Sequence, residues 1–333
     1  MSDSIVSVRS NHCTWALAFA MGLSIASIAP AQAQSYPTKP VRWVVAWPAG
    51  GLVDVAARQL ANRLQVTMGQ PIIVENKAGA NGNIGADSVT KAPADGYTLL
   101  FSSSALTTGT AMGAKMQFNA VTDLERVSLV AHAPSVLVVQ QASSIQTAKE
   151  LVERARKEPG KLSYASAGIG SPAHLTGELF KANEKIYVLH VPYTGAPAAM
   201  TDQIAGRVDY QFANVAVALP QIKAEKVRAL AVTSPQRMAS LPQVPTMSEA
   251  GMGKFDAAQW IGLLAPKGTD QSIKNKWASE INKVLENKDF EAALSNAGMI
   301  TAKPGSSEGF DTYFKQELLQ WKTVVKTANI QPE

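Results

Sequence analysis

The chain has 333 residues, yet it contains one cysteine, Cys13, and four histidines. One cysteine excludes a fold held together by internal disulfide bonds. The 31 basic residues form no dense run and do not alternate with aromatic residues, so we expect no nucleic-acid partner. Beyond the first 33 residues the histidines are His132, His174 and His190, which lack the spacing of metal ligands. We therefore predict no metal site and no cofactor.

One apolar run stands out near the start, over residues 15–29, and it is shorter than a comfortable membrane span. Ala31-Gln32-Ala33 follows it and has the A-x-A form of a signal-peptidase site. We predict that residues 1–33 are a cleaved signal peptide; an uncleaved membrane anchor is the alternative. Export of a chain without disulfide bonds predicts a periplasmic location.

After the signal peptide, about 300 residues remain, more than one hydrophobic core usually holds. Short β-rich runs alternate with helical patterns, which predicts an α/β fold in two lobes. No linker rich in glycine, proline or serine divides the chain, so we expect it to cross between the lobes twice. We predict that residues 34–133 and 257–333 form lobe 1 and residues 134–256 form lobe 2. A net charge of +5, spread along the chain, suits a small anionic ligand.

Three turns between a predicted strand and a predicted helix share one construction, with glycines before the helix: residues 47–54, 166–172 and 191–197. The first amides of a helix, and the positive end of its dipole, bind anions. In the second turn, Ser171 is well placed as the N-cap and Pro172 as the first helical residue. None of the three turns contains Arg or Lys. The predicted donors are therefore neutral amides and hydroxyls, to which residues 102–104 add further hydroxyls.

Other interpretations of these motifs are weaker. Residues 168–173 match the G-x-G-x-x-A dinucleotide fingerprint, but the next predicted strand ends without the carboxylate that this fingerprint requires. Residues 305–309 match the G-x-S-x-G hydrolase elbow, but no apolar strand precedes them, so Ser306 or Ser307 is better explained as a helix cap. Asp54 suits the start of a helix electrostatically. His174 could donate to a ligand or pack within the protein.

Several longer motifs, taken in their order and spacing, closely resemble the extracytoplasmic solute receptors of tripartite tricarboxylate transporters, the Bug or TctC family. They include Pro48-x-Gly-Gly51 with Asp54, and Gly79-Ala-Asn-Gly-Asn-Ile-Gly-Ala86. They continue with Tyr164-Ala-Ser-Ala-Gly-x-Gly-Ser-Pro-x-His174, His190-Val-Pro-Tyr193 and Arg228-Ala-Leu-Ala-Val-Thr233. The resemblance runs over nearly the whole chain after residue 33.

The resemblance implies a type II periplasmic-binding fold, in which two α/β lobes joined by a hinge close on a ligand. It implies capture of an organic carboxylate for a membrane permease, without catalysis, and we expect a monomer. The implied clamp has no charged residue. Our candidate ligand-binding residues are Ala49, Gly50, Gly51, Asp54, Ser103, Ser166, Gly168, Gly170, Ser171, His174, Tyr193, Thr194, Gly195 and Asn214.

Three departures from the family pattern bear on the ligand. Val53 replaces the usual Thr or Ser before Asp54, Trp47 stands where Phe or Tyr is common, and residues 107–118 lack an Asn-Pro element. These changes remove a donor and add apolar surface, so we expect a carboxylate with an aromatic or largely apolar body rather than citrate. The alternatives are a secreted α/β hydrolase or transferase, using Ser171 or Ser307, and a carboxylate-sensing receptor for signalling.

Overall fold

The computed structural model describes residue 4 and residues 36–253, 255 and 257–330. The predicted signal peptide, apart from Ser4, lies outside the described residues. Residues from Lys39 onward form one unit by their mutual contacts. None of the helices in the described ranges is long and apolar enough to cross a membrane.

The first sheet has six strands in the order β11-β4-β10-β3-β1-β2. β1 (Val41–Val45) pairs in parallel with β2 (Ile72–Asn76) and β3 (Thr98–Ser103), whereas β10 (Gln259–Pro266) runs antiparallel to β3 and to β4 (Leu124–Ala133). The short β11 (Ile300–Thr301) pairs with β4. Val45 lies opposite both Asn76 and Phe101, so the carboxyl ends of the three parallel strands share one edge.

The second sheet has five strands in the order β7-β6-β8-β5-β9. β6 (Ser163–Ser166) pairs in parallel with β7 (Leu189–Pro192) and β8 (Tyr210–Asn214), and β5 (Ser135–Gln140) runs antiparallel to β8 and β9 (Val227–Val232). Tyr164 at the centre lies opposite both His190 and Tyr210. Two mixed α/β sheets confirm the predicted α/β class with two lobes.

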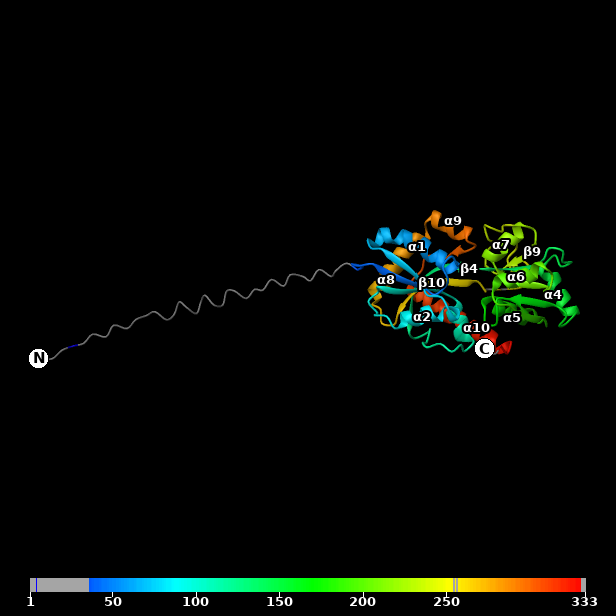
Figure 1. Ribbon diagram of the computed structural model, residues 1–333, viewed down its shortest axis with the longest axis horizontal. Helices are drawn as coiled ribbons and strands as arrows, with labels where there is room; N and C mark the ends of the chain where they lie inside the picture. Colours follow the sequence, from blue (N-terminus) through cyan, green and yellow to red (C-terminus); the bar gives the residue numbers. More distant parts are fainter. Residues whose placement is uncertain (1–3, 5–35, 254, 256, 331–333) are drawn as a thin grey trace. The chain divides into compact units, whose positions relative to one another are not determined.

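Helices connect the strands of each sheet (Figure 1). Around the six-stranded sheet these are α1 (Leu52–Met68), η1 (Ala80–Gly82), α2 (Asn83–Thr90), α3 (Ala105–Ala111), α8 (Gln271–Leu285) and α9 (Lys288–Asn296). Around the five-stranded sheet they are α4 (Ala148–Lys157), α5 (Pro172–Glu184), α6 (Ala196–Ile204) and α7 (Val215–Lys223). The last helix is α10 (Ser307–Thr327).

Local capping signals in the sequence are confirmed. Ser171 caps α5 by accepting the amide N–H of His174, and Pro172 is the first helical residue. Ser306 caps α10 by accepting the amide N–H of Gly309, so the G-x-S-x-G match is a helix start.

The chain passes between the sheets twice. β4 ends at Ala133 in the six-stranded sheet and β5 begins at Ser135 in the other, and the return lies between β9 and β10. The end of α10 packs on the five-stranded sheet, because Trp321 belongs to the same hydrophobic cluster as Phe180 and Phe212. The assignment of residues 34–133 and 257–333 to one lobe and 134–256 to the other stays a prediction.

Candidate ligand-binding cleft

Two adjoining cavities lie between the ends of strands from both sheets. The inner cavity has a volume of about 290 Å³ and the outer one about 730 Å³. Asn81, Ala167 and Ser171 line both, so the two form one continuous cleft. Ser103 at the end of β3 and Asn214 at the end of β8 line the inner cavity. This is the position at which open α/β sheets bind ligands.

The described residues that line the inner cavity all have neutral side chains. Its polar groups are hydroxyls and amides, and the rest of its wall is small apolar residues with two aromatic side chains. The indole Nε1 of Trp47 is buried and has no hydrogen-bond partner in the described part of the chain. The lining residues are Trp47, Asn81, Ser103, Ala105, Ser135, Ala167, Ser171, Pro172, Ala173, Ala196, Gln211, Phe212, Ala213, Asn214, Val217 and Gln259.

The turn between β6 and α5 is held by its own side chains. The amide N–H of Gly168 donates to Ser166 Oγ at 3.1 Å, and that of Gly170 donates to His174 Nδ1 at 3.1 Å. Both glycines have positive φ angles, +121° and +73°, which L-residues rarely adopt. These two amides are therefore already satisfied within the protein.

Two other amides of this turn are free. Ala167 lines both cavities and Ile169 lines the outer one. Within residues 36–253, 255 and 257–330, neither amide N–H has a protein acceptor. An anion at this turn would take hydrogen bonds from Ala167 and Ile169 before those from Gly168 and Gly170.

Stacked rings lie beneath the turn. The His174 and His190 rings stack with centroids 4.0 Å apart, and the His190 ring also stacks on Tyr164 at 4.8 Å. Burial, together with the charge of Lys181, lowers the pKa of His174 to about 4. Burial, followed by the charge of His174, likewise lowers the pKa of His190 to about 4. Both imidazoles are therefore neutral near pH 7, which leaves His174 Nδ1 free to accept from Gly170.

Ser166 Oγ lies 2.7 Å from His190 Nε2, the separation of a serine–histidine pair. Ser166 is 1% exposed, however, and it lines neither cavity. Its hydroxyl also donates to the carbonyl of Gly168. The pair therefore supports the turn from below and does not face the cleft.

The turn between β1 and α1 is organised by Asp54, which is 3% exposed. Its Oδ2 accepts the amide N–H of Gly50 at 2.9 Å, its Oδ1 accepts from Asn76 Nδ2 at 2.8 Å, and Arg58 Nε donates at 3.0 Å. Burial raises the pKa of Asp54, but the hydrogen bonds from Arg58, Gly50 and Asn76 outweigh it and hold the pKa below its ordinary value. Asn76 also donates to the carbonyl of Trp47. Asp54 thus shapes the turn that carries Trp47 to the cavity.

The structure gathers about half of the predicted site residues around the cleft. Those that line it are Ser103, Gly168, Gly170, Ser171, Tyr193, Thr194 and Asn214. The others line neither cavity: Ala49, Gly50, Gly51, Asp54, Ser166, His174 and Gly195. Ligand contact by any of these residues stays a prediction.

Five polar residues that were not among the predicted site residues also line the cleft: Asn81, Lys115, Ser135, Gln211 and Gln259. Asn81 had a usable signal, because it lies between Gly79 and Gly82 before a helix, and it adopts a positive φ of 54°. The others reach the cleft through pairing and packing that local sequence does not encode.

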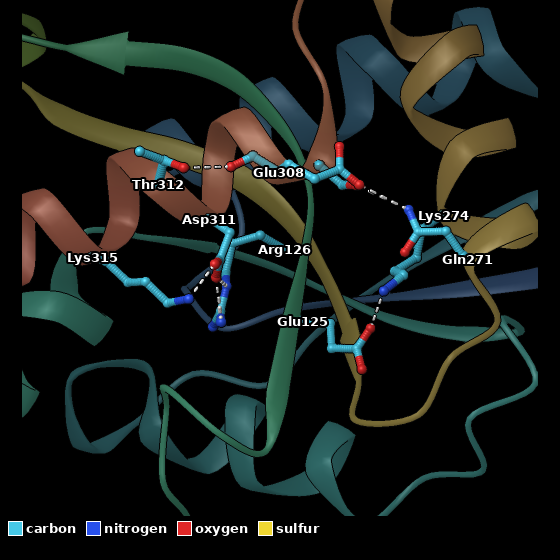
Figure 2. A pocket seen from close by; sticks show the side chains of 9 residues that line it. Glu125, Arg126, Gln271, Lys274, Glu308, Asp311, Thr312 and Lys315 are labelled. Atoms are coloured by element: carbon cyan, nitrogen blue, oxygen red, sulfur yellow. Dashed lines mark hydrogen bonds and ion pairs between the residues drawn. The ribbon is translucent and has the colours of Figure 1, made fainter.

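A further hollow, of about 380 Å³, lies on the six-stranded-sheet side (Figure 2). In this hollow, Glu308 accepts a hydrogen bond from Gln271. Its cationic side chains are all paired in the described residues: Arg126 and Lys315 with Asp311, and Lys274 with Glu125. These pairs fasten α10 and α8 to β4, so the hollow has no free charge to offer an anion. No cluster of metal-ligating side chains occurs among the residues that the structure describes.

Comparisons with known proteins agree on one family. The family model described as "Tripartite tricarboxylate transporter family receptor" matches residues 56–330. Protein BugT of Bordetella pertussis is 37% identical over 302 residues, which cover 90% of this chain and 92% of BugT.

Two solved structures from Rhodopseudomonas palustris are similar to this chain. One is Rpa4515 with adipate, with a TM-score of 0.76 and 31% identity over 90% of this chain and 100% of that one. The other is MatC with bound malate, with a TM-score of 0.72 and 28% identity over 87% of this chain and 100% of that one.

Proposed function

Because this chain belongs to the tripartite tricarboxylate transporter receptor family, a family of solute-binding proteins and not of enzymes, we propose that it captures a small organic carboxylate in its cleft. The similar proteins solved with adipate and malate support this ligand class. In this proposal the carboxylate is delivered to a membrane permease, and the receptor works as a monomer in the periplasm after cleavage following Ala33.

The lining of the inner cavity carries the proposal of ligand type. A cavity of about 290 Å³ suits a small organic acid. Its neutral hydroxyls and amides can hold one carboxylate. None of the described lining residues carries a positive charge, so several carboxylates buried there would lack a cationic partner. Trp47 and Phe212 add flat apolar surface. We therefore assign a ligand with an aromatic or largely apolar body and at most two carboxylates, which excludes citrate.

Filling the inner cavity tests the proposal. Ala173 on α5 lines this cavity, whereas Ala182 on the same helix is exposed. We expect Ala173→Leu to lower the affinity for the best carboxylate by about tenfold or more, because the added side chain occupies the space of the ligand. Ala182→Leu should leave the affinity unchanged. Isothermal titration calorimetry with aliphatic and aromatic carboxylates and citrate measures both.

Equal affinities in the two variants would place the ligand elsewhere. Tight binding of citrate together with weak binding of the apolar acids would contradict the assigned ligand type.

A further inference from the structure

Lys115 lies in the segment that follows α3 and lines the outer cavity. Its side chain is exposed, and in the described residues it forms no hydrogen bond or ion pair. Other exposed lysines, such as Lys157 on α4, also have no ion pair in the described residues, so what distinguishes Lys115 is its place in the wall of the outer cavity. There its charge is available to a ligand.

Among the described residues that line either cavity, no other side chain is charged. Tyr193 is the other ionisable group, and its phenol already donates to Asp202 at 2.9 Å. An acidic group that reaches the outer cavity would thus meet one cationic partner, and a lysine ammonium binds carboxylates and other oxyanions with charge-assisted hydrogen bonds.

The segment that carries Lys115 and the turn between β6 and α5 both line the outer cavity, and they touch at one point. Met112 belongs to this segment, and a Cβ placed on Gly170 would lie 2.8 Å from Met112 Sδ. On the turn's side, the amides of Gly168 and Gly170 are committed to Ser166 and His174. The free amides of Ala167 and Ile169 can still donate to an anion there, and Lys115 adds the one charged group among the described residues that line the outer cavity.

We propose that Lys115 determines specificity by pairing with a second acidic group of the ligand in the outer cavity. The ligand is then an elongated dianion: one carboxylate and an apolar body occupy the inner cavity, and the second acid extends past Asn81 and Ser171, which line both cavities. This inference rests on the proposed carboxylate-binding function and adds the charge and length of the ligand.

The test compares Lys115→Met with a control of equal charge change. Lys157→Met suits the control, because Lys157 on α4 is exposed and lines neither cavity. Calorimetry would measure dicarboxylates from succinate to suberate, the isomers of benzenedicarboxylate, and the monocarboxylate that matches each. We expect Lys115→Met to weaken the tightest dicarboxylate about tenfold, and its matched monocarboxylate less than about twofold. Lys157→Met should change neither by more than about twofold.

The outcomes separate the two proposals. If the wild type binds a monocarboxylate at least as tightly as its matched dicarboxylate, or if Lys115→Met weakens both acids equally, the role of Lys115 is refuted while carboxylate binding stands. If the wild type binds no acid of either series, both proposals fail. A loss confined to the dicarboxylate, and reduced by added salt, supports the inference.

Discussion

The neutral state of His174 leads to a quantitative prediction about acid. His174 is 5% exposed, and burial lowers its pKa from 6.5 to about 4. Its Nδ1 accepts the amide N–H of Gly170, which a protonated Nδ1 cannot do. In the unfolded chain the imidazole takes up a proton near pH 6.5, whereas in the folded chain it resists protonation down to about pH 4. The folded state therefore loses stability as the pH falls from about 6.5 to about 4, and the loss levels off below that.

The size of the loss follows from the two pKa values. With a pKa of 6.5 in the unfolded chain and about 4 in the folded chain, the free energy of unfolding at pH 4.5 is lower by about 2.5 kcal/mol. His190, in the same stack, adds to the loss in the same direction. His174→Asn removes the titrating group but keeps an acceptor, Oδ1, within reach of Gly170. We expect the variant to lose about 2.5 kcal/mol less than the wild type between pH 7 and pH 4.5.

Urea denaturation of both proteins at the two pH values measures this difference. The comparison cancels the contribution of carboxylates that are shared by the two proteins. If both proteins lost the same free energy within about 0.5 kcal/mol, His174 would not be a neutral, buried acceptor, and our account of the turn would be refuted.

Two further predictions concern the turns that frame the cleft. Asp54→Asn should lower the free energy of unfolding in urea by about 2–4 kcal/mol, because it removes the Arg58 ion pair and sets an amide N–H₂ against the donors Gly50 and Asn76. Asp87→Asn, which removes the surface ion pair with Lys91, should lower it by less than about 1 kcal/mol. Equal losses in the two variants would contradict a central role for Asp54. Gly170→Val should lower the affinity for the carboxylate by more than about tenfold, because a Cβ added at this position would lie 2.8 Å from Met112 Sδ. Gly69→Val, with a similar φ of +67° but open space around it, should share only the backbone strain of about 1–3 kcal/mol, so an equal loss of affinity in both would count against the cleft.

Features written in short stretches of sequence were predictable. The Ser171 cap depends on residues 171–174 alone, and the order of strands and helices follows from local hydrophobic patterns. The placement of Ser103 and Asn214 at one cavity was also predictable, because each follows a strand end and strand ends are where such sheets bind ligands.

Features that depend on distant segments were not predictable. Ser166 reaches His190 because β6 pairs with β7 in a particular register, and His174 stacks on His190 across 16 positions of sequence. The amide of Gly170, a predicted ligand donor, is instead bonded to His174 Nδ1 four positions along the chain, and burial of that ring keeps Nδ1 an acceptor. Lys115 lines the same cavity as this turn because the end of α3 packs against Gly170 through Met112.

The central claim is that the inner cavity holds a small organic carboxylate. Mass spectrometry of the small molecules released from the natively purified protein, with the Ala173→Leu variant beside it, tests that claim most directly. We predict an acid with one or two carboxylates and an apolar body from the wild type, and little or none from the variant. A released ligand without an acidic group, or equal recovery of the same ligand from both proteins, would contradict the claim.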